Sequence, residues 1–283
     1  MLTLLRVWRL IVLLVWTLAL IPVQFAFVLT GSRLQRALPI VFHRFVARML
    51  RIQVEVHGAP SADRPVLFVA NHSSWLDIVI LSTAAPLSFV AKSEIARWPG
   101  FSILAKLQRS VFIERRRGKA KEGVNDIQAR LRAGDNIVLF AEGSSGDGNS
   151  VLPFKSSMFS AAEIDLGGGR LPTVQPVSMA YTHLDGFPLG RRQRHRLTWY
   201  GKMSLPSHLW NVFGQGYARV VLQFHAPVRP NDFASRKDLA FYCHARVAEG
   251  HARSINGRPQ QVVAVAPPAP LPPPGVVAAP PPA

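Results

Sequence analysis

The sequence predicts an α/β fold in which a mixed, largely parallel sheet is flanked by helices, with an N-terminal helix embedded in a membrane. Three observations predict this fold. From residue 64 onward, short apolar runs of strand length alternate with helical patterns. Residues 10–29 form a long apolar stretch near the N-terminus. Of the 283 residues, 48% are hydrophobic and only 17% are charged, so the chain is more apolar than most soluble enzymes.

The apolar stretch defines a first region, residues 1–32, predicted to be a hydrophobic membrane segment. Only Thr17, Pro22 and Gln24 interrupt residues 10–29, which are enough to cross a hydrocarbon core about 30 Å thick. Insertion into one leaflet, with a bend at Pro22, is the alternative. No small-x-small cleavage site follows, which disfavours a signal peptide.

Residues 33–62 are predicted to connect this segment to the main domain. Apolar and basic positions mix over residues 34–50, which predicts an amphipathic helix. It would lie at a membrane interface or dock on the main domain. Residues 52–56 alternate as a strand and end at His57-Gly58.

The main domain is predicted over residues 63–257. Strands are expected at residues 66–70, 87–91, 110–113, 137–140, 173–181 and 219–225, and helices at 76–83, 119–132, 158–164 and 235–254. Pro176 lies inside one of these strands, which predicts a sheet edge or a bulge there. Residues 258–283 form a tail; ten of the chain's 23 prolines and no charged residue lie from Pro259 onward. Such a composition predicts disorder or polyproline structure.

The net charge of +17 indicates an anionic partner. Arginines lie on both sides of the apolar stretch, Arg6 and Arg9 before it and others after it, which favours acidic lipids. No zinc-finger spacing and no RNA-binding aromatic motif occur, so a nucleic-acid partner is not expected. Cys243 is the only cysteine, which excludes an internal disulfide and a multi-cysteine metal site.

The most informative stretch is Asn-His-Ser-Ser-Trp-Leu-Asp at residues 71–77, directly after a predicted strand. A histidine is the usual proton acceptor near neutral pH. The Asp77 carboxylate would hold one ring nitrogen of His72 and leave the other free to deprotonate a hydroxyl. The alternative is structural, because residues 74–77 also fit a Ser-x-x-acid capping box.

Two further segments follow predicted strands. Residues 110–113 run into Glu114 and the arginines at 115–117, which suit a phosphate or carboxylate at the end of a strand. Residues 141–148 read Ala-Glu-Gly-Ser-Ser-Gly-Asp-Gly, a loop whose backbone a ligand can approach closely, and Lys155 follows it. A solvated basic turn and a flexible turn are the structural alternatives.

Together these segments resemble the glycerolipid acyltransferase family, whose familiar member is 1-acylglycerol-3-phosphate acyltransferase. The match covers about residues 51–230. Residues 71–77 resemble its His-x-x-x-x-Asp block, 111–115 its apolar strand ending in acid-Arg, 140–144 its Phe-Pro-Glu-Gly-Thr block, and 174–177 a fourth block.

The resemblance implies a lysolipid O-acyltransferase that moves a fatty acyl group to the free hydroxyl of 1-acyl-glycerol-3-phosphate in phospholipid synthesis. It implies His72 as general base, Asp77 as its partner, and a substrate-binding set of Arg115, Glu142, Gly143, Ser144 and Lys155. The donor would be a thioester of acyl-carrier protein or coenzyme A, with no metal or other cofactor. The enzyme would sit on the cytoplasmic face of the inner membrane.

The departures from the family pattern concern the head group. Ser145 stands where the family usually has arginine, Ala141 replaces a proline, and residues 108–110 lack the usual glycine. The 142–148 loop, together with residues 152–157, 199–201 and 205–210, looks more like the bacterial branch that acylates lyso-ornithine lipid. That acceptor is the alternative. A membrane-bound esterase or thioesterase would use the same histidine and aspartate with water as acceptor, and a non-enzymatic membrane adaptor would recruit a partner through its tail.

Overall fold

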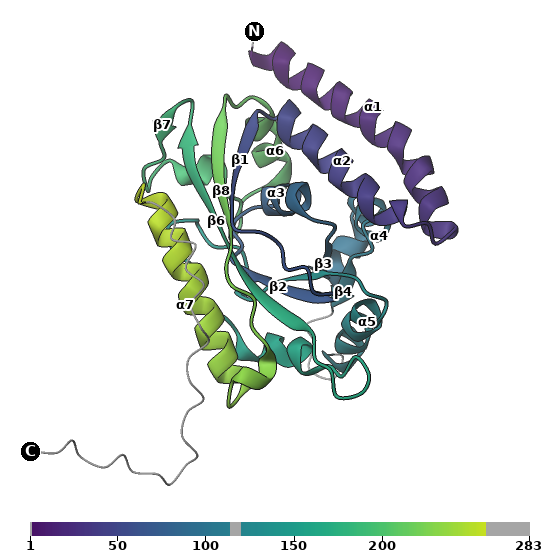
Figure 1. The fold of residues 1–283 in the computed structure, drawn as a ribbon. Coiled ribbons are helices and arrows are strands. Elements are labelled where there is room, and N and C mark those ends of the chain that lie inside the picture. The colour runs from purple at the N-terminus through teal and green to yellow at the C-terminus, as the bar shows by residue number, and fades with distance from the viewer. Residues whose placement is uncertain (1, 114–119, 259–283) are drawn as a thin grey trace, which may run out of the picture.

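The fold is built on one mixed sheet, in a computed structural model that describes residues 2–113 and 120–258 (Figure 1). The strand order is β1-β8-β6-β2-β5-β3-β4, and β7 pairs with β6. Neighbouring strands are parallel except for β6, which is antiparallel to β8 and β7. The predicted largely parallel sheet is therefore confirmed. The strands are β1 (Ile52–His57), β2 (Val66–Ala70), β3 (Ser88–Lys92), β4 (Val111–Ile113), β5 (Ile137–Phe140), β6 (Thr173–Leu184), β7 (Phe187–Pro188) and β8 (Ala218–Phe224).

Helices cover both faces of this sheet, because the central strands are apolar on both sides. In β2, Phe68 and its even-numbered neighbours pack with α2, α3 and α6, whereas Leu67 and Val69 pack with α5, α7 and the 3₁₀ helix Ser156–Glu163. The sequence predicts no helix at Phe101–Leu107 (α4) or Leu205–Phe213 (α6). The helices are α1 (Leu2–Leu29), α2 (Leu34–Met49), α3 (Leu76–Ala84), α4 (Phe101–Leu107), α5 (Ala120–Arg132), α6 (Leu205–Phe213) and α7 (Arg236–Ile255). Shorter 3₁₀ turns lie at Ser93–Arg97, Arg194–Arg196 and Pro230–Asp232.

Pro176 does not mark a sheet edge, as β6 is an interior strand between β8 and β2. The expectation of an edge is wrong, but an irregularity is present. Pairing with β8 ends at Val177–Phe224, and the chains meet again at a bridge between Val174 and Val228. One more residue lies on the β8 side of that interval than on the β6 side. The proline, which has no N–H to donate, therefore sits where the ladder is already broken.

The two N-terminal helices run side by side along the domain (Figure 1). α1 is long and apolar enough to cross a membrane, and Pro22 lies within it. It is nevertheless tied down at both ends. Arg9, only 3% exposed, donates from Nη1 to the carbonyls of Phe213 and Gln215, each at 2.9 Å. Gln24 donates to the carbonyls of Gln35 and Leu107 at 2.8 and 2.9 Å.

α2 docks on the main domain through its apolar side, where Val46, Ala47 and the following Leu50 join the core. The docking interpretation thus describes its inner face. At the other end of the domain, Ser235 caps α7 by accepting hydrogen bonds from the backbone of Lys237 and Asp238. The predicted disorder of the proline-rich tail concerns residues 259–283, which lie outside the described residues.

Candidate active site

Residues of the candidate catalytic and substrate-binding sets follow two adjacent parallel strands. His72 comes two residues after β2 and Glu142 two residues after β5, and these strands pair directly. The carboxyl ends of parallel strands meet at one edge of a sheet, where α/β proteins commonly bind ligands. The fold therefore brings these residues, which are far apart in the sequence, into a single site.

His72 and Asp77 form a hydrogen-bonded pair. His72 Nδ1 lies 2.8 Å from Asp77 Oδ2, and the carboxylate is fully buried. A buried carboxylate can accept the Nδ1 proton, which leaves Nε2 with a lone pair. The imidazole is 19% exposed and its ring stacks on Phe140 with 4.0 Å between centroids, so it is held firmly yet open on one side.

Asp77 also holds the turn before α3. Its Oδ2 accepts hydrogen bonds from the backbone N–H groups of Ser73 and Ser74, at 2.7 and 2.9 Å. Ser74 Oγ instead donates to the carbonyl of Leu197 at 2.7 Å. Asp77 therefore makes the acid's half of the capping box and the bond to His72 together, whereas the Ser74 side chain does not cap α3.

Glu142 anchors the backbone of His72. Its Oε1 accepts from the His72 N–H at 2.8 Å, and its Oε2 from the Leu152 N–H at 3.3 Å. The Gly146 N–H donates to the His72 carbonyl at 2.8 Å, so this loop binds both the backbone N–H and the backbone carbonyl of His72. Glu142 is only 3% exposed. Burial raises its pKa to about 8, against the effect of the two N–H donors, and the charge of Asp77 adds to the rise.

The other substrate-binding candidates border this loop. Gly143 has φ +72°, and a Cβ there would lie 2.9 Å from Lys155 Nζ, so the lysine lies directly over the glycine. The backbone N–H of Lys155 donates to the carbonyl of Ala141 at 2.9 Å, which places this lysine beside the loop. Ser144 is exposed next to them. Arg115, the remaining candidate, lies outside the described residues.

The sequence does not predict which distant segments contact the residues around His72. Tyr181 on β6 donates from its hydroxyl to Asp77 Oδ1 at 2.6 Å. The segment after the 3₁₀ turn Arg194–Arg196 forms another wall, where the Trp199 N–H donates to the Ser73 carbonyl at 2.7 Å. Gly148 (φ +77°) allows this approach, since a Cβ there would lie 2.7 Å from Thr198 Cγ2. No local pattern around residues 181 or 199 signals these contacts.

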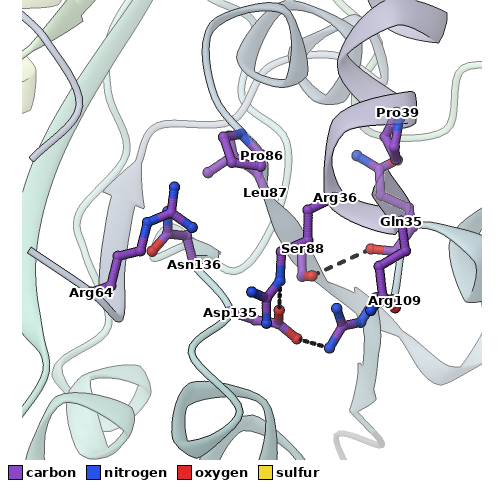
Figure 2. Close-up of a pocket in the computed structure, with 11 residues that line it drawn as sticks. Gln35, Arg36, Pro39, Arg64, Pro86, Leu87, Ser88, Arg109, Asp135 and Asn136 are labelled. Atoms are coloured by element: carbon purple, nitrogen blue, oxygen red, sulfur yellow. Dashed lines mark hydrogen bonds and ion pairs between the residues drawn. The ribbon is translucent and has the colours of Figure 1, made fainter. Parts of the chain in front are cut away.

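A second cluster of charged residues lies at the opposite edge of the sheet (Figure 2). It lines a hollow of about 310 Å³, open to solvent, beside the amino ends of β3 and β5. Asp135, 3% exposed, binds Arg36 Nε at 2.9 Å and Arg109 Nη2 at 2.5 Å. Burial lowers the pKa of Arg109, which Asp135 opposes. This cluster is remote from His72, because β5 and its flanking residues separate the two edges by roughly 20 Å.

The site at the carboxyl edge can therefore accept a proton from a hydroxyl at His72 Nε2 and stabilise the resulting imidazolium through Asp77.

Known proteins are similar to this chain in sequence and in fold. A family model described as Acyltransferase matches residues 53–180. A lyso-ornithine lipid O-acyltransferase of Brucella abortus is 42% identical over 242 residues, covering 84% of this chain and 89% of that protein. A 1-acyl-sn-glycerol-3-phosphate acyltransferase of Neisseria meningitidis is 35% identical over 172 residues, covering 60% and 63%. The crystal structure of the 1-acyl-sn-glycerophosphate acyltransferase PlsC from Thermotoga maritima superposes with a TM-score of 0.61 at 23% identity, covering 90% of this chain and all of that one.

Proposed function

The chain belongs to the acyltransferase family and is an acyltransferase, and on that premise we propose that it moves a fatty acyl group from a thioester to the free hydroxyl of a lysolipid. The observation that carries the proposal is the His72–Asp77 pair, with Nδ1 bound to a buried carboxylate and the ring open to solvent on one side. A base held in this way suits an alcohol acceptor and needs no serine or cysteine nucleophile.

The reaction follows from that geometry. His72 Nε2 takes the proton of the acceptor hydroxyl as its oxygen attacks the carbonyl carbon of the thioester. The tetrahedral intermediate then collapses, the C–S bond breaks, and the leaving thiolate takes the proton back from His72. The products are the ester and the free thiol. Asp77 stabilises the imidazolium between these two steps.

We assign Glu142 to the support of His72 rather than to direct contact with the head group, because both of its oxygens bond backbone N–H groups of the protein. Lys155, lying over Gly143 next to Ser144, is left as the cation that can meet a polar acceptor. Arg115 is proposed to bind the acceptor as well, as the family resemblance implies.

Lyso-ornithine lipid is the acceptor that we place first. Relatives with that name in Brucella abortus and Rhizobium meliloti are 42% and 38% identical over most of both chains. Ser145 also stands where the family usually has an arginine, a side chain that would suit a phosphate. The second candidate is 1-acylglycerol-3-phosphate, favoured by the Neisseria relative and by the strongly basic composition. The donor is proposed to be an acyl-carrier protein or coenzyme A thioester, with no metal or other cofactor.

A membrane location is proposed from α1 and α2. The outward side of α1 exposes large apolar residues, among them Ile11, Leu14 and Leu18, each more than half exposed. The contacts of Arg9 and Gln24 hold α1 against the domain, so burial of its outward side in lipid would keep the active site at the membrane surface. We propose the cytoplasmic face of the inner membrane, as the family resemblance implies.

The test is transfer of a labelled acyl group by the full chain in lipid vesicles. Both donors are offered with lyso-ornithine lipid, 1-acylglycerol-3-phosphate and no acceptor, and His72→Ala is the control. We expect ester formation that needs a lysolipid and disappears with His72→Ala. Free fatty acid formed equally without acceptor would identify an esterase. Full turnover by a folded His72→Ala variant would exclude His72 as the base. Neither transfer nor hydrolysis by the wild-type chain would favour an adaptor role.

The head-group site has a separate test. Arg115→Ala should raise the lysolipid concentration needed for half-maximal rate while leaving the dependence on the acyl donor nearly unchanged. An unchanged lysolipid dependence would remove Arg115 from the acceptor site.

A further inference from the structure

The Asp77 carboxylate divides its two oxygens between different partners. Oδ2 binds His72 Nδ1 and two backbone N–H groups, whereas Oδ1 accepts the Tyr181 hydroxyl at 2.6 Å. Tyr181 comes from the middle of the sheet, on β6, and is 2% exposed. The carboxylate is itself fully buried, so water does not compete for these bonds.

We propose that Tyr181 is a positioning residue for acyl transfer, whose hydroxyl fixes the orientation in which Asp77 binds His72. The proposal rests on the proposed function, because the orientation matters only where His72 acts as the base.

The physical reason is that the terminal torsion of an aspartate is soft. Rotation about its Cβ–Cγ bond has broad, roughly two-fold preferences, so the partners of the two oxygens decide where the carboxylate plane lies. Oδ2 points to the loop and Oδ1 to the phenol. A hydrogen bond from a neutral donor to a carboxylate is short and about twice as strong as one between neutral groups. Tyr181 therefore limits the rotation that would pull Oδ2 away from His72 Nδ1.

The phenol stays protonated, and therefore a donor, near neutral pH. Burial raises the pKa of Tyr181 well above its ordinary value, and the negative charge of Asp77 raises it further. A protonated phenol facing a carboxylate donates to it.

The same strand also fixes the start of the catalytic loop. Asn71 and Met179 exchange two hydrogen bonds: the Met179 N–H donates to Asn71 Oδ1 at 2.8 Å, and Asn71 Nδ2 donates to the Met179 carbonyl at 3.0 Å. Met179 precedes Tyr181 by two residues on β6. The phenol and the backbone beside His72 are therefore parts of one rigid unit, which is what an orienting contact requires.

The direction of the effect on pH follows from the bond. Donation from Tyr181 withdraws electron density from Asp77. When this donation is lost, the carboxylate is a stronger acceptor in the conformations that keep the bond to His72, and it stabilises the imidazolium more. The conformations that lose the bond account for the fall in kcat. Two other titratable groups interact electrostatically with Asp77: Glu142 from the loop after β5, and His251 from α7, whose pKa burial lowers to about 4. Lys155 borders the same loop. Substitutions at residue 181 leave all three in place.

The first variant is Tyr181→Phe, which removes the hydroxyl and keeps the ring. We expect kcat to fall about tenfold and the midpoint of the acid limb of kcat/KM to move up by roughly half a pH unit. The KM values for donor and acceptor should be unchanged, because Tyr181 reaches Asp77 and not the substrates. The full chain is assayed in vesicles with the acceptor that it uses.

A second variant replaces Tyr181 by 3-fluorotyrosine, which keeps the shape and makes the hydroxyl a stronger donor. It remains informative where Tyr181→Phe fails to fold, and the acid limb should move in the opposite direction, to lower pH. The control is Tyr217→Phe, which deletes a phenol bonded to Gln53 and should shift neither midpoint nor kcat.

The outcomes separate the two proposals. The role of Tyr181 would be overturned if the fluorotyrosine variant, and Tyr181→Phe where it folds, transferred acyl groups normally with the wild-type pH midpoint. That result would leave the proposed function standing. Absence of transfer to every lysolipid by the wild-type chain would overturn the proposed function itself.

Discussion

The two edges of the sheet each bury an aspartate, and they use it in opposite ways. At the carboxyl edge, Asp77 is bound by an imidazole, a phenol and two backbone N–H groups. At the amino edge, Asp135 is bound by Arg36 and Arg109, with Arg130 at 4.0 Å. Both carboxylates are at most 3% exposed. They differ in whether any partner can change its charge near neutral pH.

That difference separates a site for proton transfer from a structural one. Guanidinium groups keep their charge in proteins, so Asp135 and its arginines form a permanent ion cluster that ties α2 to the start of β5. One partner of Asp77 is the imidazole of His72, and imidazole is the side chain best suited to accept and release a proton in catalysis. Burial alone therefore does not identify a catalytic carboxylate; the chemistry of its partners does.

The largest effect is expected on activity at the carboxyl edge. Asp77→Asn keeps the shape and an acceptor oxygen but removes the charge that fixes the His72 tautomer. We expect kcat to fall by roughly three to four orders of magnitude while the fold is kept. Steady-state kinetics together with thermal unfolding of the same preparation measure both quantities. Activity within a few-fold of wild type would show that His72 does not depend on Asp77.

The matched substitution at the amino edge, Asp135→Asn, should do the reverse. It leaves Arg36 and Arg109 without their counter-charge, and Arg109 is largely buried. We expect a loss of about 2–3 kcal/mol in the free energy of unfolding, below the range for a fully buried pair because Arg36 is one-third exposed. The kcat of the folded fraction should stay near wild type. A large kcat loss without destabilisation would mean that the amino edge takes part in function.

The sequence predicts the parts of the molecule that depend on local pattern. The apolar runs of β2 and β5 and the five-residue spacing of His72 and Asp77 are visible in it, and the sheet brings them together. The contacts of Tyr181 and Trp199 are not predictable from the sequence, because each joins segments more than 100 residues apart with no signal of its own. Pro176 predicts a sheet edge or a bulge, and the sequence does not choose between them, since the extra residue that makes the irregularity lies after β8.

The last prediction concerns the charge of Glu142 at the carboxyl edge and the pH dependence of stability. Its pKa is raised from 4.5 to about 8 in the folded protein. The folded state therefore holds this proton more tightly than the unfolded state, so its contribution to stability is complete at low pH and is lost as pH rises toward 8. Glu142→Gln should flatten the decline of unfolding free energy between about pH 4.5 and 8. Thermal unfolding across that range measures it, and Glu163→Gln, which changes an exposed carboxyl paired with Arg236, is the control. A variant that keeps the wild-type slope would show that Glu142 ionises in the folded protein as it does in the unfolded chain, and that the loop around His72 carries its charge at neutral pH.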